Sequence, residues 1–255
     1  MVRRGSPLEL VLNIDKNTLE SNASASGSFI TKFSAWAPGV ESSGEWNEWA
    51  LGKREISLSS AGPDLAFTEA KFRRRLSQIS KMTVQVVHDL LPVAENSKIF
   101  FLSFWGELSR QFKINKMLIE DNDILPAAFS LSVFNAPAAL ASIAFGLKGG
   151  YSAIYPGNNS FISGLKLAEA ALLYRESESA AEPEHAADSE EIIFIYADEE
   201  IPPEYREIFP GKHFPLAFAF LLSRKQNGSS IPLSSLITGT NTPEDFLKRL
   251  LLKKA

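Results

Sequence analysis

Hydrophobic residues recur along this chain with two different periods. Phe29, Thr31 and Phe33 recur at every second position, which suits a β-strand that ends at the Pro38–Gly39 turn. Between Thr68 and Leu91 the apolar residues instead recur every three or four positions, which predicts an amphipathic helix stopped by Pro92. The chain is therefore expected to mix strands with helices.

Continuous apolar runs predict strands that are covered on both faces, as in the middle of an α/β sheet. Three such runs are present: IFFLSFW at 99–105, IIFIYAD at 192–198 and PLAFAFLLS at 215–223. A helical stretch to about Leu118 follows the first run, and FSLSVF at 129–134 is expected to be extended. These runs alternate with helical segments, so the pattern predicts the α/β class.

Two Ala-rich helices are expected between residues 135 and 175, on either side of a short strand. Asn135 can cap the first, with Pro137 in its first turn and Gly146 at its end. Its residues are apolar or small nearly all round, which predicts a buried helix. The strand YSAIY then enters the turn PGNNS before the second helix starts at Phe161. Strand, tight turn and helix is the arrangement of a nucleophile elbow.

Two segments are predicted to lie outside the packed core. Residues 1–28 end in a polar run rich in Ser and Asn, which predicts a flexible N-terminal extension to a domain at 29–255. Residues 176–191 carry seven acidic residues and no Lys or Arg, which predicts a mobile acidic loop within that domain. At the other end, Thr242 is expected to cap a final helix that finishes in lysines.

Composition and charge exclude several classes of function. With 45% hydrophobic and 22% charged residues, the chain is in the range of soluble globular proteins. Its formal net charge of −4 provides no basic field for nucleic acid or an anionic membrane. The most apolar stretch, 129–147, is interrupted by polar residues and Pro137, so no stable membrane insertion is expected. We expect a cytoplasmic protein.

The residues available for chemistry are few. There is no cysteine, which excludes disulfides, thiolate metal sites and a cysteine nucleophile. His88, His185 and His213 are scattered without the spacing of metal ligands. The glycines at 146–150 have neither the Walker nor the dinucleotide spacing. No metal and no cofactor are expected.

A resemblance to a known family is carried by five segments in order: FSAWAPGVESSGEWNEWA, KFRRRLSQISKM, SFWGELSR, ILPAAFSLSVFNAPAALASIAFGLKGGYSA and NNSFISGLKLAEAALL. Over about residues 29–222 the chain resembles the β-ketoacyl synthase N-terminal-domain-like family, in the truncated chain-length-factor form associated with aryl polyene pigments. The resemblance implies a thiolase-like α/β fold, of which this chain is essentially one half of a condensing enzyme. It also implies a heterodimer with a catalytic ketosynthase subunit in type II polyketide or fatty-acid-like biosynthesis. In that role the chain would shape the acyl-chain tunnel and work with an acyl-carrier protein.

Working condensing enzymes of that fold present a cysteine at the elbow, backed by two histidines from their second half. The thiolate accepts an acyl group from a thioester, and the histidines polarise the carbonyl as carbon dioxide leaves. Reading back from ISG at 162–164 places the cysteine position on Phe161, whereas reading forward from GLKG at 146–149 places it on Asn158. Neither can form a thioester, so no catalytic residue is assigned. The elbow is expected to be a pseudo-active site made of Asn158, Asn159, Ser160 and Phe161.

The resemblance also implies where the partner binds. In the thiolase-like fold the strand that enters the elbow commonly pairs across a two-fold axis. An uncovered strand edge of that kind needs a partner. The expected interface residues are Asn135, Tyr151, Ile154 and Tyr155.

Two other functions stay open. A serine hydrolase or acyltransferase would use Ser160, with His213 as the base and Asp198 or Glu199 orienting it, although GNNSFIS departs from the G-x-S-x-G pattern. A docking or scaffold module for an acidic acyl-carrier protein would instead use a local basic patch. That patch consists of Arg73, Arg74 and Arg75, with Lys71 and Lys81 nearby.

Overall fold

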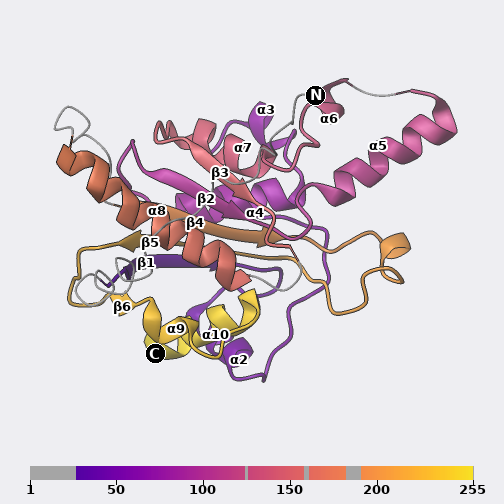
Figure 1. Cartoon of the computed structure of the whole chain (residues 1–255). Coiled ribbons are helices and arrows are strands. Elements are labelled where there is room, and N and C mark those ends of the chain that lie inside the picture. The colour runs from indigo at the N-terminus through magenta and orange to yellow at the C-terminus, as the bar shows by residue number, and fades with distance from the viewer. Residues whose placement is uncertain (1–26, 124–125, 158–160, 182–190, 255) are drawn as a thin grey trace, which may run out of the picture.

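A mixed six-stranded sheet runs through the middle of the molecule, with helices on both faces (Figure 1). The structure, a computed structural model, describes residues 27–123, 126–157, 161–181 and 191–254. In the described part the strand order is β3-β2-β4-β5-β1-β6. The strands are β1 (Phe29–Trp36), β2 (Lys98–Leu102), β3 (Tyr151–Ile154), β4 (Glu191–Asp198), β5 (Leu216–Ser223) and β6 (Ile231–Pro232).

The sheet combines a parallel half and an antiparallel half. β2 pairs in parallel with β3 on one side and with β4 on the other. β5 runs antiparallel to both β4 and β1, and β6 is antiparallel to β1. The three predicted apolar runs form β2, β4 and β5, and β5 is buried along its whole length. β3 is an edge strand, so its outer backbone groups face away from the sheet.

Helices cover the two faces of the sheet with different side chains. The helices are α2 (Ser43–Ala50), α3 (Ala70–Arg73), α4 (Gln78–His88), α5 (Leu108–Asp121), α6 (Pro126–Phe129), α7 (Ala136–Phe145), α8 (Phe161–Ala181), α9 (Ser234–Ile237) and α10 (Pro243–Lys254).

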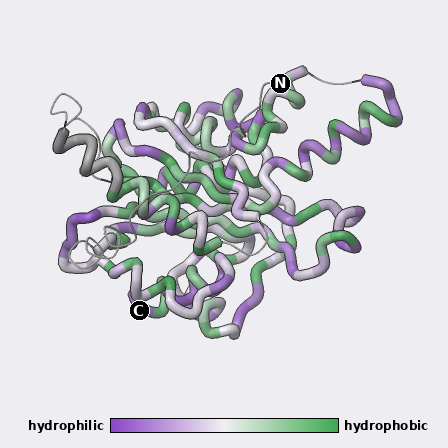
Figure 2. The backbone as a smooth tube through the Cα atoms, viewed as in Figure 1, coloured by the Kyte–Doolittle hydropathy of each residue, from purple (hydrophilic) through white to green (hydrophobic). Residues whose placement is uncertain are grey.

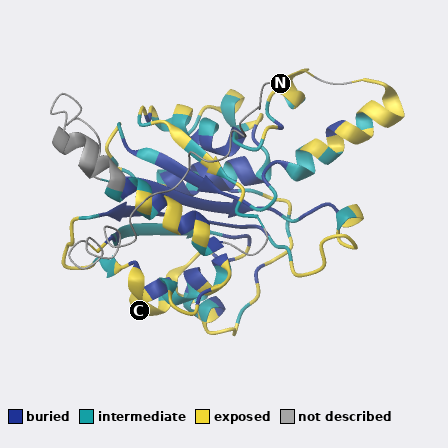
Figure 3. Ribbon diagram, in the orientation of Figure 1, coloured by how far each residue is buried: buried dark blue, intermediate teal, exposed yellow. Residues whose placement is uncertain are grey.

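Side chains alternate between the faces along β4 and β5, as the pleat of a strand requires. Phe194 and Phe218 belong to the core under α8 and α10, whereas Ile193 and Ala219 belong to the core under α4 and α7. Figure 2 shows hydrophobic residues concentrated in the strands, and Figure 3 shows the same strands buried. The aromatic side therefore lies between the sheet and α8.

The helix expected over 68–91 is broken in two. α3 ends at Arg73, and α4 begins again after Ser77, whose hydroxyl accepts a hydrogen bond from the Ser80 amide at 3.2 Å. Ser77 has extended backbone angles, and a serine in that geometry is a favoured N-cap. The capping serine interrupts a helix that the apolar period alone predicts to be continuous.

The prediction that FSLSVF is extended is wrong. This segment contains the end of α6 and two turns. The hydroxyl of Ser130 donates to the carbonyl of Ala127 at 3.1 Å, and that of Ser132 donates to the carbonyl of Phe129 at 2.8 Å. Local serine-to-backbone hydrogen bonds of this kind compete with strand pairing.

The helix α7 has the predicted limits but not the predicted surroundings. It ends at Gly146, whose φ of 63° is favoured by glycine. The side chain of Asn135 does not cap it and donates to the Tyr151 hydroxyl at 3.0 Å instead. Ala138 and Ala141 pack on the sheet, but Ile143 is 72% exposed. The helix is therefore buried on one face only.

Both expected boundaries shift where the structure describes them. Ser28 is buried, and its carbonyl accepts a hydrogen bond from the Leu233 amide at 2.9 Å, so the fold includes Ser28. Residues 176–181 of the expected acidic loop continue the helix α8. Residues 1–26 and 182–190 lie outside the described residues. The predicted cap of α10 is confirmed, because the Thr242 hydroxyl accepts from the Asp245 amide at 3.1 Å.

Candidate functional site

The carboxyl ends of β2 and β4 meet at a buried aspartate. Asp198 accepts hydrogen bonds from the Ser103 hydroxyl at 2.5 Å and the Tyr196 hydroxyl at 2.8 Å. The amides of Phe104 and Trp105 also donate to it, at 3.1 and 3.0 Å. Burial raises the pKa of Asp198 to about 6, so the carboxylate is ionised at neutral pH and accepts all four bonds. It holds the turn after β2, which is why β2 ends at Leu102.

Two further buried carboxylates meet at the start of α4. Glu107 accepts from the hydroxyls of Ser77 at 2.6 Å and Ser80 at 2.7 Å, and it pairs with Arg110 at 3.1 Å. Glu199 accepts from the Ile79 amide at 3.2 Å, near the positive end of the helix dipole. Burial, followed by the charge of Glu107, raises the pKa of Glu199 to about 7. In the sequence, Glu199 stands out only as a possible partner of His213, and no local pattern indicates its position at the start of α4.

The first residue of α8 is wholly buried in an aromatic core. The ring centroid of Phe161 lies 6.1 Å from that of Phe194, 6.0 Å from that of Tyr196 and 5.4 Å from that of Phe246. Three residues later, a Cβ on Gly164 would come within 2.1 Å of Cδ1 of Leu102, so a larger residue there would require the Leu102 side chain to move. Asn158, Asn159 and Ser160 lie outside the described residues. The start of α8 is thus filled by phenyl groups.

The four residues predicted for the partner interface lie together at the β3 edge. Asn135 binds the hydroxyl of Tyr151, which is 39% exposed, and Tyr155 is 63% exposed. Ile154 is half-buried against the core under α8. The structure therefore brings these residues to one edge of the sheet, where the Asn135–Tyr151 bond links α7 to β3.

Of the three arginines in the predicted basic patch, two are exposed to solvent and one is bonded within its own segment. The guanidinium of Arg73 donates to the Thr68 carbonyl within its own segment. Arg74 and Arg75 are exposed, and Arg110 of α5 donates to the Arg75 carbonyl at 3.0 Å. Arg110 therefore joins the patch from a different element, which no local sequence pattern indicates.

The histidine of the hydrolase hypothesis has other neighbours. His213 Nε2 lies 2.9 Å from the Phe209 carbonyl, and its ring packs edge-on against Trp105 at 5.2 Å. Asp198 accepts hydrogen bonds from the turn after β2, and Glu199 accepts one from the Ile79 amide of α4. Neither carboxylate therefore orients His213. The acid–base pairing predicted for a hydrolase is not assembled.

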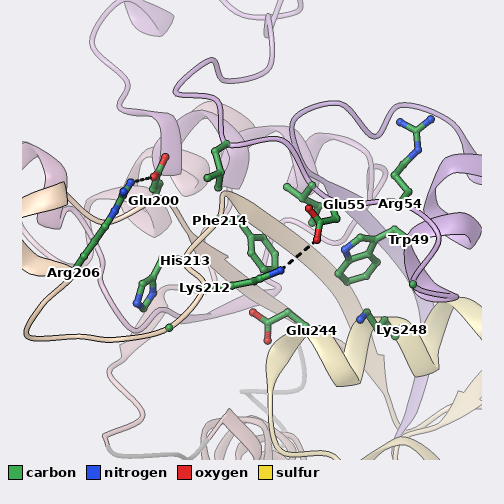
Figure 4. Close-up of a pocket in the computed structure, with 14 residues that line it drawn as sticks. Trp49, Arg54, Glu55, Glu200, Arg206, Lys212, His213, Phe214, Glu244 and Lys248 are labelled. Carbon is green, nitrogen blue, oxygen red and sulfur yellow. Dashed lines mark hydrogen bonds and ion pairs between the residues drawn. The ribbon is translucent and has the colours of Figure 1, made fainter.

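A pocket of about 510 Å³ opens beside this histidine, between the loop after α2, the loop before β5 and the start of α10 (Figure 4). Two ion pairs cross its rim: Lys212 with Glu55 at 3.3 Å, and Arg206 with Glu200. Lys248 lies 5.1 Å from the ring of Trp49. Because basic and acidic side chains both line the pocket, it presents no field of a single sign.

Neither a metal centre nor a membrane span is found in the described part of the chain. Among residues 27–123, 126–157, 161–181 and 191–254, no group of three or more His, Cys, Asp or Glu side chains could hold a metal ion. No helix of that same part has the length and apolar character to cross a membrane.

Comparison with known proteins agrees with this geometry. Residues 46–245 match the family model described as β-ketoacyl synthase, N-terminal domain. No protein with a curated function matches the sequence.

Solved structures match over most of the chain. One is from the complex of a ketosynthase (ApeO) with its chain length factor (ApeC) from Xenorhabdus doucetiae, with 25% identity, a TM-score of 0.63, and coverage of 88% of this chain and 91% of that one. Another is from AntDE:AntF, a type II polyketide synthase acyl-carrier protein in complex with its ketosynthase, with 12% identity, a TM-score of 0.55, and coverage of 78% and 63%. The predicted thiolase-like α/β fold is confirmed by these ketosynthase structures.

Proposed function

The chain belongs to the β-ketoacyl synthase N-terminal-domain family, and on that premise we propose that it is a non-catalytic chain-length-factor subunit. It pairs with an active ketosynthase in a type II, aryl-polyene-like pathway and shapes the tunnel that holds the growing acyl chain. One observation carries the proposal: a chain without cysteine aligns over 88% of its length with a chain from a ketosynthase and chain length factor complex.

The chemistry of condensation supports the non-catalytic part of the proposal. The reaction needs a thiolate to hold the acyl group and donors to stabilise the carbonyl oxygen. At the start of α8 this chain places the buried ring of Phe161 against Phe194 and Phe246. Such packing leaves no room for an acyl group at Phe161. The tunnel is therefore shaped at the surface shared with the partner.

The edge strand β3 is the surface that we assign to the ketosynthase. Its outer backbone groups can extend a sheet across the interface. Tyr155 after β3 and Ile143 of α7 add exposed apolar area, and the bond between Asn135 and Tyr151 fixes α7 to the edge. The interface proposed here consists of Asn135, Ile143, Tyr151, Ile154 and Tyr155.

A carrier-protein contact is the second part of the proposed role. Arg74 and Arg75 form an exposed basic surface that would attract an acidic acyl-carrier protein, whereas the charge of the neighbouring Arg110 is paired with Glu107. We expect its contribution to be seen mainly in the association rate and in salt dependence. Arg74 and Arg75 follow directly after α3, and β3 remains available for the ketosynthase.

The experiment that tests the function is co-expression with the ketosynthase encoded in the same gene neighbourhood. We expect a stable complex that condenses malonyl and acyl thioesters, whereas the isolated chain releases no carbon dioxide from malonyl-carrier protein. Absence of a complex would overturn the partner role. Steady carbon dioxide release by this chain alone would overturn the non-catalytic role.

A further inference from the structure

The helix α5 projects away from the sheet with little of its surface covered (Figure 1). Of its 14 residues, only Ile114 is buried. Figure 3 shows exposed residues along its far end. Helices of this length are marginal in water unless an apolar face packs on something. Among the described residues, the far end of α5 therefore has no apolar packing of the kind that normally stabilises such a helix.

The exposed part of this projection is apolar at two places. Near the end of α5, Ile119 is 83% exposed and Leu118 is 44% exposed. On the returning segment, Phe129 at the end of α6 is 60% exposed, and Val133 after it is 47% exposed. Exposed apolar groups gathered on one projection are typical of a protein interface. We call α5 and α6, with the following residues to Phe134, the arm.

The base of the arm is fixed to the rest of the fold. The Gln111 side chain donates to the Ser132 carbonyl at 2.7 Å, which joins the outgoing and returning segments. The ring of Phe112 packs edge-on against Tyr205 at 5.7 Å. Phe134 lies over Gly106, where a Cβ would come within 2.5 Å of its ring. A fixed base with an uncovered end holds the apolar groups ready for a partner.

We infer that the ketosynthase subunit covers this arm, so that its interface extends from β3 along α7 to α5. This inference rests on the proposed function and deepens it. Continuity is the first reason: the arm leads directly into Asn135, which is bonded to Tyr151 on the β3 edge.

Charge is the second reason for this partner. Beyond Asn115, α5 and the residues after it carry one lysine, Lys116, and three acids, Glu120, Asp121 and Asp123. An acidic carrier protein would be repelled by that excess of negative charge. An apolar interface with the ketosynthase suits the exposed Ile119 and Phe129 better.

The test measures binding of the ketosynthase by full-length variants in the arm. We expect Ile119→Lys and Phe129→Ser each to raise the Kd at least tenfold without lowering the Tm of the isolated chain, because both side chains are exposed. Ile208→Lys is the matched control, since Ile208 is 65% exposed but lies on the loop before β5. Its affinity should equal that of the original chain.

The outcomes separate the arm from the proposed function. If the arm variants bind normally while Tyr155→Lys does not, the inference is wrong and the partner role stands. If the original chain does not bind the ketosynthase, both fail. Conversion of a homodimer to a monomer by Ile119→Lys, with ketosynthase binding intact, would assign the arm to a second copy. Loss of carrier-protein binding alone would also contradict the inference.

Discussion

Two neighbouring buried carboxyl groups, Asp198 and Glu199, differ in how well hydrogen bonds offset the cost of burying their charge. Asp198 accepts from four donors, whereas Glu199 accepts from the Ile79 amide and faces the charge of Glu107. Their pKa values of about 6 and about 7 both lie above the ordinary values of 3.8 and 4.5. At neutral pH, Glu199 is thus the carboxyl that is changing its protonation.

The stability of the fold should therefore fall as the pH rises through 7. The folded state binds a proton on Glu199 more tightly than the unfolded chain does. The free energy of unfolding is therefore higher at low pH, and this added stability is lost as the proton leaves. Between pH 6 and pH 8, deprotonation of Glu199 should lower the free energy of unfolding by about 1.4 kcal/mol. Urea unfolding at several pH values should show a flatter profile for Glu199→Gln than for the original chain. The exposed Glu207→Gln is the control, and an unchanged profile in Glu199→Gln would contradict the prediction.

A second prediction at this scale concerns Phe161, one of the two positions that we propose as the replacement of the nucleophile. Phe161 is fully buried among aromatic rings, so Phe161→Ala should lower stability by about 3–5 kcal/mol through the cavity it leaves. The measurements are complex melting and product length in a reconstituted pathway, compared with Asn158→Ala. If Asn158→Ala shifts product length while Phe161→Ala alters neither property, the replaced position is Asn158.

At the scale of elements, β3 and α7 form one unit at the sheet edge. In the described part of the chain, β3 pairs with β2 alone, and α7 packs alanines on the sheet while its Ile143 is exposed. The hydrogen bond from Asn135 to Tyr151 joins the two elements. An edge built in this way is stable within the chain, yet it offers backbone and apolar side chains to a partner.

A charge placed in this edge should prevent assembly. We expect Ile154→Lys to abolish co-purification with the ketosynthase, because a lysine in a buried seam loses its hydration. Ile154 also packs against the core, so Tyr155→Lys, at a 63% exposed position, separates binding from folding. Leu252→Lys on α10 is the control. An unaffected complex in both β3 variants would place the interface elsewhere.

At the scale of the whole molecule, α10 closes the face of α8. A complete condensing enzyme of the thiolase-like fold has two similar halves. In this chain Phe246 of α10 is wholly buried and lies 5.4 Å from Phe161 and 6.0 Å from Phe218. The C-terminal helix thus completes the aromatic core on that side of the sheet.

Removing this contact should weaken the whole fold. Phe246→Ala is expected to lower the free energy of unfolding by about 3–5 kcal/mol, since a buried phenyl group is lost. Leu252→Ala on the same helix is the matched control, because Leu252 is 46% exposed and should change stability little. Denaturant unfolding of both variants checks this. Equal effects would mean that α10 does not complete the core.

Elements with a strong local pattern were predictable from the sequence. The apolar runs at 192–198 and 215–223 became β4 and β5, and Thr242 caps α10 as expected. Local hydrogen bonds explain why two other predictions were wrong. Ser77 caps α4 and so interrupts the helix predicted over 68–91, and Ser130 and Ser132 bond to the backbone in FSLSVF, which forms turns and no strand. The spacing of apolar residues does not show whether a serine hydroxyl will bond to the backbone in place of the regular hydrogen bonds of a helix or strand.

The sequence by itself determined the α/β class, the absence of a thiol and the resemblance to chain-length factors, because composition and local periodicity are properties of the chain alone. Only the tertiary structure decided which groups share an environment. It placed β3 at an edge, brought Glu107 and Glu199 together at the start of α4, and left Ile119 uncovered on a projecting helix. Burial and charge coupling arise from residues far apart in sequence, so no local pattern contains them.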